Sequence, residues 1–224
     1  MTAGSKADGA PKRVPLADQL RAELATGRFA PGQRLVEADL TERFQASRTR
    51  VREALQHLAA EGYVEHLPNR GSRVRRLSRR DVRQIYELRE VVEGLAARRA
   101  ALGIGDPDLR HGLHALWAEM EMAARTGDVA RYLPLNTRLH DRLIRADGSV
   151  YLQAAAERLR VPILRLQFEV LMTTPNLQLS HDQHAEILSA IEAGHGEGAE
   201  IAMRKHLRSS FEAVWALPDE LFDR

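Results

Sequence analysis

Three histidines in the second half of the chain have the spacing and the setting to bind a metal ion together. His140 follows Asn136 by four residues, so both side chains share the apolar face of a helix expected to begin at Asp128. His184 and His206 lie on the apolar faces of two later predicted helices. Imidazole nitrogens bind zinc, nickel, copper or iron, and three of them with one amide or carboxylate oxygen leave coordination positions open. The three histidines form a candidate site for a divalent transition metal, with zinc or nickel as the first choices.

A structural role is the alternative for each of these histidines, because a buried imidazole usually finds a hydrogen-bond partner. The convergence of three such residues favours the metal. His181, three residues before His184, is a candidate substitute ligand, but it lies nearer the edge of its apolar stripe. The other histidines are expected at the surface or in structural roles; they are His57, His66, His111, His114 and His195.

The elements that would position these side chains are predicted helices. Ser78 and Asp81 have the spacing of a capping pair, which predicts a helix to about Ala101. Its apolar stripe comprises Val82, Ile85, Leu88, Val92, Leu95 and Ala96. Further helices are predicted to begin at Asp106 and Pro107, at Asp128, and near Ser149, Gln178 and Gly198. No strand pattern interrupts them, so we expect an antiparallel helical bundle.

The first third of the chain has a different pattern. Apolar residues recur at helical spacing from Leu16 to Leu24, from Val36 to Phe44, and between the N-cap candidate Ser47 and Gly62. Two short extended segments, YVEHL and RVRRL, then flank the glycine-containing sequence PNRGS, which is typical of a hairpin. Three helices followed by a hairpin predict a winged helix-turn-helix. The fold class is therefore mainly α, with this domain followed by the helical bundle.

Composition excludes several classes of protein. Hydrophobic residues make up 44% of the 224 residues and charged residues 29%, as in ordinary globular proteins. No apolar run is long enough to cross a membrane, and the N-terminus lacks the pattern of a secretory signal. The absence of cysteine excludes disulfides and thiolate metal sites. We expect a cytoplasmic protein.

The charge is unevenly distributed. Residues 1–80 contain 16 Lys and Arg against 9 Asp and Glu, whereas the remainder contains 17 against 22. A basic first third suits contact with a polyanion such as DNA, since phosphate neutralisation supplies most sequence-independent affinity. Arg48, Thr49 and Arg52 lie in the opening turns of the third helix, opposite its apolar stripe and on the same side as Gln56. Those are the turns that enter a major groove.

The most distinctive pieces of this region are G-R-F-A-P-G-Q-R-L, S-R-T-x-V-R-E-A-L, L-A-A-E-G and the wing sequence N-R-G. With them, the segment from Leu16 to Val74 resembles the DNA-binding domain of the GntR family of bacterial regulators. Arg50 stands where members commonly have proline or threonine, and Ala38 replaces a DNA-contacting arginine of some members. The resemblance implies DNA contacts from Ser47, Arg48, Thr49 and Arg52, with the wing tip around Arg70 and Gly71 reaching the minor groove. Arg50 is a further candidate for DNA contact in the same turn.

The second half contains Y-E-L-R-x-x-V-E-x-x-A-A-R-R-A, N-x-x-L-H, H-A-E-I-L-S-A-I and M-R-K-H-L. These pieces resemble the FCD effector domain of one branch of the same family. Members often bind a divalent metal through an Asp or Asn and three histidines, which implies Asn136, His140, His184 and His206 as ligands here. A carboxylate metabolite then completes the metal shell. Asn136 replaces the commoner aspartate, which should weaken the binding of the metal or change which metal is bound. The alternative is that the site has lost its metal.

An anionic effector also requires a cationic partner, because a buried carboxylate is costly unless it is paired. Arg89, at the edge of its apolar stripe, is the first candidate for this effector contact, and Arg165 is the second. A surface ion pair is the alternative for both, and for Arg165 it is the favoured one.

The domain prediction follows from these patterns. We expect a disordered arm over residues 1–12, a winged helix-turn-helix over 13–76, a linker over 77–80, a helical effector-binding and dimerisation domain over 81–217, and a tail over 218–224.

The predicted function is a metabolite-responsive DNA-binding transcription regulator, a repressor in the first instance, that acts as a homodimer on a two-fold operator. One alternative is a metal-dependent hydrolase fused to a DNA-binding module. It is disfavoured because no carboxylate is expected beside the histidines as a general base and because the H-E-x-x-H motif is missing. The other alternative is an architectural DNA-binding protein with a purely structural helical domain.

Overall fold

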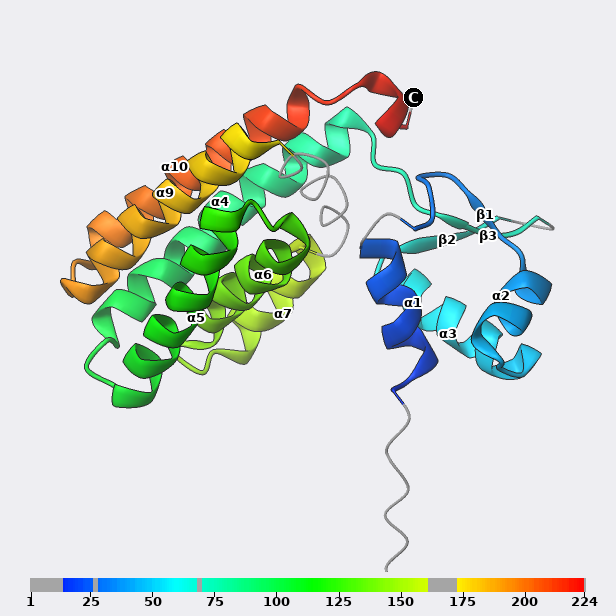
Figure 1. Cartoon of the computed structure of the whole chain (residues 1–224), viewed down its shortest axis with the longest axis horizontal. Helices are drawn as coiled ribbons and strands as arrows, with labels where there is room; N and C mark the ends of the chain where they lie inside the picture. Colours follow the sequence, from blue (N-terminus) through cyan, green and yellow to red (C-terminus); the bar gives the residue numbers. More distant parts are fainter. Residues whose placement is uncertain (1–13, 26–27, 68–69, 161–172, 224) are drawn as a thin grey trace, which may run out of the picture.

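A computed structural model describes residues 14–25, 28–67, 70–160 and 173–223 (Figure 1). The first part of the chain folds as a winged helix-turn-helix. Its elements are α1 (Leu16–Ala25), β1 (Arg34–Leu35), α2 (Glu37–Phe44), α3 (Arg48–Ala60), β2 (Val64–Leu67) and β3 (Gly71–Val74). The three strands form an antiparallel sheet in the order β1-β3-β2. The predicted winged helix-turn-helix is confirmed.

The three helices close on a small apolar core of their own. Leu20 from α1, Leu40 from α2 and Leu58 from α3 are at most 2% exposed. The side chain of Ser47 accepts a hydrogen bond from the backbone N–H of Arg50 and so caps α3, as the sequence predicts. Because the apolar stripe of α3 faces inward, its opposite side is left to solvent.

The sheet differs in two details from the expected hairpin. The strand β3 begins at Gly71, where φ is +80°, rather than at Arg73. The strand β1 was not predicted, because two residues are too few to show an alternating pattern; it pairs Arg34 with Arg73 and buries Leu35. The pairing of β2 with β3 in the wing therefore extends to Gly71, at the turn between the two strands.

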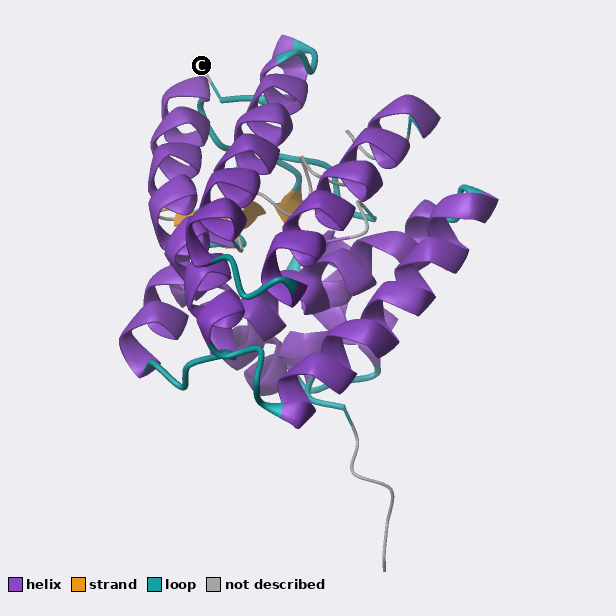
Figure 2. Ribbon diagram, turned by 90° about the vertical axis from the view of Figure 1, so that its left-hand side faces the viewer, coloured by secondary structure: helices purple, strands orange, loops and turns teal. Residues whose placement is uncertain are grey.

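The rest of the described chain is a helical bundle (Figure 2). Its buried residues form a core separate from that of the winged helix-turn-helix. Its helices are α4 (Arg79–Leu102), α5 (Pro107–Thr126), α6 (Val129–Arg145), α7 (Val150–Arg160), α9 (Thr174–Glu192) and α10 (Gly196–Trp215). Ser78 and Asp81 form the predicted capping box at the start of α4. The predicted class of an all-helical bundle is confirmed. In the part of the chain described, no helix is long and apolar enough to cross a membrane.

The buried face of α4 differs from the predicted stripe. Leu88 and Leu95 were expected in the core, but they are 54% and 36% exposed. The ion pair of Arg89 and Glu93 is buried instead, on the same side as Tyr86. The prediction for these two leucines was wrong because a pattern of apolar residues cannot anticipate that a charged pair will occupy the core.

The end of α10 is joined to the start of α4 by Arg79. Its guanidinium donates hydrogen bonds to the backbone oxygens of Trp215 and Leu217 and lies 4.2 Å from the ring centroid of Phe222. The segment 218–224, predicted as a tail, contains the 3-10 helix η2 (Asp219–Leu221), and Phe222 is buried in the bundle core. Up to Asp223, this segment packs against the first residues of the bundle.

Candidate functional site

The three predicted metal ligands come together inside the bundle. His140 from α6, His184 from α9 and His206 from α10 are each at most 4% exposed. One ring nitrogen from each lies within 4.8 Å of the others. The Nε2 atoms of His140 and His184 are 3.1 Å apart. Side chains from three helices, α6 and the consecutive pair α9 and α10, thus place three imidazoles around one point.

Each histidine is held through its other nitrogen by a different side chain. The Nδ1 atom of His140 lies 2.5 Å from Oε2 of Glu93, and Nδ1 of His184 lies 3.2 Å from the hydroxyl of Tyr132. The Nδ1 atom of His206 lies 3.0 Å from Oε1 of Gln183. Such contacts fix the orientation of a ring and leave the second nitrogen of each available as a ligand.

Burial determines the charge of the cluster. It lowers the pKa of His206 to about 3, with a further lowering from the neighbouring His140 and Arg89. It also lowers the pKa of His184 well below the ordinary value, again reinforced by the neighbouring histidines. Because a metal binds the neutral form of imidazole, both rings are in the binding form at neutral pH.

A buried ion pair lies behind His140. Oε1 of Glu93 accepts a hydrogen bond from Nε of Arg89 at 2.6 Å, and both side chains are almost completely buried. Burial disfavours the charged form of both side chains, but the attraction between the two opposite charges is larger than this effect. Arg89 and His140 hold the pKa of Glu93 well below its usual range, and Glu93 raises the pKa of Arg89.

Asn136 supplies the fourth candidate ligand. It is 7% exposed, and its Oδ1 atom has no hydrogen-bond partner among the described residues. Such an orphaned oxygen requires an explanation, because an unmade hydrogen bond in the interior is costly. A metal ion would satisfy it. The donor set of three imidazoles and one oxygen therefore fits zinc or nickel.

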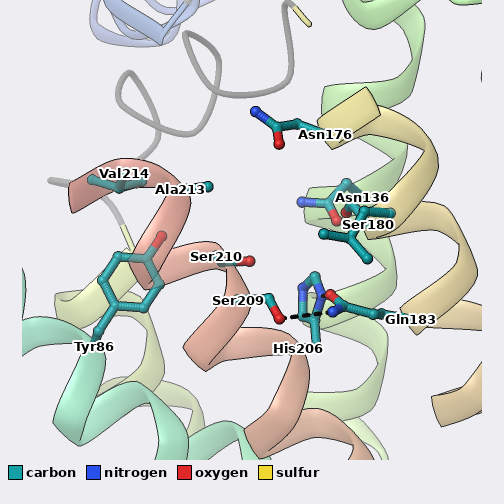
Figure 3. Close-up of a pocket in the computed structure, with 11 residues that line it drawn as sticks. Tyr86, Asn136, Asn176, Ser180, Gln183, His206, Ser209, Ser210, Ala213 and Val214 are labelled. Atoms are coloured by element: carbon teal, nitrogen blue, oxygen red, sulfur yellow. Dashed lines mark hydrogen bonds between the residues drawn. The ribbon is translucent and has the colours of Figure 1, made fainter. Parts of the chain in front are cut away.

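A pocket opens beside the cluster and is lined by two of the four candidate ligands, Asn136 and His206 (Figure 3). Its wall is formed by α4, α6, α9 and α10. The polar residues that line it are Tyr86, Asn136, Asn176, Ser180, Gln183, His206, Ser209 and Ser210. A small molecule in this pocket would contact the candidate metal ligands directly.

The remaining predicted residues of this half lie in different settings. His181 stacks on Trp117 with ring centroids 4.3 Å apart and is not part of the histidine cluster. Arg89 lies behind the cluster and does not line the pocket. Arg165 lies outside the described residues. The effector contacts predicted for Arg89 and Arg165 stay predictions.

Glu93 is the residue that the sequence analysis missed, since no carboxylate was expected beside the histidines. A signal was present, because Glu93 follows Arg89 by four residues and lies on the same helical face as Tyr86 and Ala97. Arg89 and Glu93 lie on a helical face whose other residues, from Tyr86 to Ala100, are aromatic or small. Two opposite charges on such a face indicate a buried ion pair.

The predicted DNA-binding residues lie on one exposed surface. Ser47, Arg48, Thr49, Arg50 and Arg52 are all exposed at the start of α3. Nε of Arg52 donates to both carboxylate oxygens of Glu37, at 2.9 and 2.8 Å. Across the described parts of the chain no ion pair involves Arg48 or Arg50.

The wing residues have a comparable exposure. Arg70 and Gly71 are exposed, and among the described residues no atom beyond its chain neighbours lies within 4 Å of the position that a Cβ on Gly71 would take. The positive φ of Gly71, rather than its packing, is what favours glycine there.

A winged helix-turn-helix followed by a helical bundle with an internal pocket defines a DNA-binding transcription regulator. The family described as "Bacterial regulatory proteins, gntR family" matches residues 13–74, and the FCD domain matches residues 84–209. The chain belongs to the GntR family, in the branch that carries an FCD domain.

Curated relatives match along most of their length. The HTH-type transcriptional repressor RspR of Escherichia coli K12 is 28% identical over 207 residues, which cover 91% of this chain and 89% of the relative. A probable D-xylose utilization operon transcriptional repressor of Paenarthrobacter nicotinovorans is 29% identical, covering 90% of each chain. A regulator from an unstable DNA locus of Streptomyces ambofaciens is 32% identical, covering 97% of this chain and 92% of the relative.

Solved structures show the same fold. Escherichia coli McbR/YncC superimposes with a TM-score of 0.79 at 21% identity, covering 89% of this chain and 95% of that one. A GntR regulator of Rhodococcus sp. RHA1 gives 0.78 at 23% identity, covering 91% and 97%. The family and its relatives are transcription regulators and not enzymes, so the alternative of a metal-dependent hydrolase is set aside.

The histidine cluster predicts how the stability of the metal-free protein depends on pH. An unfolded histidine has a pKa of about 6.5, whereas His206 in the fold has a pKa of about 3. Between these values the unfolded chain binds more protons, so the free energy of unfolding falls as the pH falls. The expected slope is up to about 1.4 kcal/mol per pH unit for each such histidine.

Urea unfolding with a chelator present, between pH 7 and pH 5, measures this slope. His206→Asn should flatten it, whereas substitution of the exposed His111 by Asn should leave it unchanged. An equal slope in the wild type and in His206→Asn would show that His206 is not held neutral by the fold.

Proposed function

We propose that this protein is a metabolite-responsive transcription repressor whose helical domain binds a small carboxylate effector through a divalent metal. Asn136, His140, His184 and His206 would hold the ion. The observation that carries the proposal is that the pocket is lined by His206 of the histidine cluster and by Asn136, the fourth candidate ligand. A metal bound there would supply positive charge at the inner end of the pocket, where it would attract a carboxylate.

The polar lining of the pocket supports a small hydrophilic ligand. The neutral amides and hydroxyls of Asn176, Ser180, Ser209 and Ser210 would bind the rest of the molecule by hydrogen bonds.

The names of two relatives favour a repressor, and the expected DNA target favours a cytoplasmic location. RspR of Escherichia coli and the xylose-operon regulator of Paenarthrobacter nicotinovorans are both named as repressors. The exposed basic start of α3 suits operator DNA, which is a cytoplasmic target in bacteria. Effector binding would act by favouring one arrangement of the DNA-binding domains over another.

The outer surface of α4 supports a homodimer. Leu88, Val91 and Leu95 are spaced by three and four residues, Leu102 follows seven residues later, and all four side chains are exposed. The flanks of α4 pack against α7 and α10, so this stripe is the outward side of the helix. A stripe at this spacing suits a second copy of the same helix, with a two-fold axis that matches two operator half-sites.

The metal proposal predicts a stoichiometric ion that depends on His184. Purified wild-type protein should contain about one zinc or nickel ion per chain, and His184→Ala should contain little. The exposed His111→Ala is the control and should retain the metal. A carboxylate effector at 100 times its dissociation constant should stabilise the metal-loaded protein by about 2.7 kcal/mol.

Elemental analysis and a thermal-shift screen of small organic acids measure both effects. Equal and negligible metal in the wild type and in His184→Ala, after loading with zinc and nickel, would contradict the metal proposal. Acids that shift the melting temperature of His184→Ala as much as that of the wild type would show that the effector does not need the cluster.

The DNA proposal predicts a larger role for Arg48 than for Arg52. Arg48→Ala should weaken operator binding by about 1–3 kcal/mol if the side chain contacts a base. Arg52→Ala should cost less, because Arg52 must share its guanidinium with Glu37. Gel shifts on the protein's own promoter region measure this, with the exposed Arg125→Ala in α5 as the control. Wild-type affinity in Arg48→Ala would remove that residue from the interface.

The dimer proposal predicts that charges on the outer stripe of α4 separate the copies. Leu88→Glu combined with Leu95→Glu should convert the dimer to a monomer, because like charges would face each other in a desolvated interface. Sedimentation velocity measures this. Met122→Glu, at an equally exposed apolar position on α5, is the control. A double variant that sediments as the wild type does would place the interface elsewhere.

A further inference from the structure

Glu93 is a buried carboxylate placed between a cation and a candidate metal ligand. One oxygen, Oε1, lies 2.6 Å from Nε of Arg89, and the other, Oε2, lies 2.5 Å from Nδ1 of His140. We propose that Glu93 is a positioning residue: it holds the proton of His140 on Nδ1 and thereby turns the Nε2 lone pair toward the point shared by the three histidines. The inference rests on the proposed metal site and adds a residue that does not itself touch the ion.

The direction of each hydrogen bond follows from the chemistry of the partners. A guanidinium can only donate, so Oε1 of Glu93 must accept from Arg89. An ionised carboxylate can only accept, so Oε2 must receive a proton from Nδ1 of His140. The Nε2 atom of His140 is then the nitrogen that faces Nε2 of His184, 3.1 Å away. Two nitrogens directed at the same point suit a shared cation.

A neutral version of the same arrangement holds His206. The side-chain amide of Gln183 donates from Nε2 to Ser209 at 2.8 Å, which leaves its oxygen to accept from Nδ1 of His206 at 3.0 Å. In both cases a second contact holds the acceptor in place: Gln183 donates to Ser209, and Glu93 accepts from Arg89. For Gln183 this contact decides whether the oxygen or the nitrogen of the amide faces the imidazole. For Glu93 that choice does not arise, because both carboxylate oxygens accept.

This geometry makes Glu93→Gln an informative substitution. The amide has one oxygen, and Arg89, which can only donate, will take it. The NH₂ group then faces His140 and donates to Nδ1, so the histidine proton is forced onto Nε2. That nitrogen is thereby lost as a ligand. The substitution preserves size and shape, and it reverses the direction of one hydrogen bond.

The experiment uses the full-length protein and two measurements. Nitrogen-15 spectra of the histidine rings, recorded without metal, report whether Nδ1 of His140 carries a proton. Competition with a chromophoric chelator reports the affinity for Zn²⁺. We expect Nδ1 to be protonated in the wild type and unprotonated in Glu93→Gln, with a loss of Zn²⁺ affinity of about 10- to 100-fold.

Glu90→Gln is the matched control. Glu90 lies on the same helix and also pairs with an arginine, Arg208, at 2.9 Å, but it does not contact the cluster. This variant should keep the wild-type spectrum of His140 and its affinity for Zn²⁺. A merely structural effect of removing an ion pair from α4 would appear in both variants.

A second pair of variants keeps the test decisive if Glu93→Gln does not fold. With Arg89→Met, the cation is gone, and the amide of an added Glu93→Gln is free to turn its oxygen toward His140. This double variant should restore the proton on Nδ1 and much of the Zn²⁺ affinity. Arg89→Met with Glu93→Leu has no acceptor at this position and should restore neither.

The outcomes separate this inference from the proposed function. A proton that stays on Nδ1 in Glu93→Gln, or equal Zn²⁺ affinity in the two double variants, would overturn the role of Glu93. If the wild type bound no Zn²⁺ at all, the proposed metal site would fall, whereas the spectra of metal-free protein would still decide whether Glu93 sets the position of the His140 proton.

Discussion

The burial of one ion pair constrains the centre of the helical domain. Arg89 and Glu93 lie in the middle of α4, almost without solvent contact. Removing two charges from water is expensive, and each further hydrogen bond to the pair recovers part of that cost. His140 satisfies the second oxygen of Glu93, which ties α6 to α4. His184 from α9 and His206 from α10 lie close to the same imidazole.

The same helix joins the site to the DNA-binding half. The first residue of α4, Arg79, binds the backbone at the end of α10, the helix that carries His206. A few residues earlier, Arg76 donates to the backbone oxygen of Pro31, just before β1. A continuous set of contacts therefore runs from the pocket wall to the base of the wing. These contacts connect the two domains physically. To transmit a signal, the residues along them would also need two alternative arrangements.

Much of the fold could be predicted because caps and periodicity are local properties. Ser47 and the Ser78–Asp81 pair mark helix starts through hydrogen bonds within one turn, and the inward side of α6 is clear from its strongly one-sided pattern. The histidines were found for the same reason. The role of Glu93 could not be predicted, since it depends on α6 lying across α4. Leu88 and Leu95 were misplaced because an apolar stripe does not reveal whether it faces its own core or solvent.

The presence of asparagine at position 136 has an electrostatic consequence. Three neutral imidazoles and one amide bring no formal charge to the ion, and Glu93, the carboxylate that contacts His140, is already compensated by Arg89. A divalent cation in such a donor set would keep both of its positive charges inside a low-dielectric interior. An anion that entered the pocket would cancel them, so occupancy of the pocket and retention of the ion would reinforce each other. Ion and ligand would then behave as cooperative partners, each held more tightly in the presence of the other.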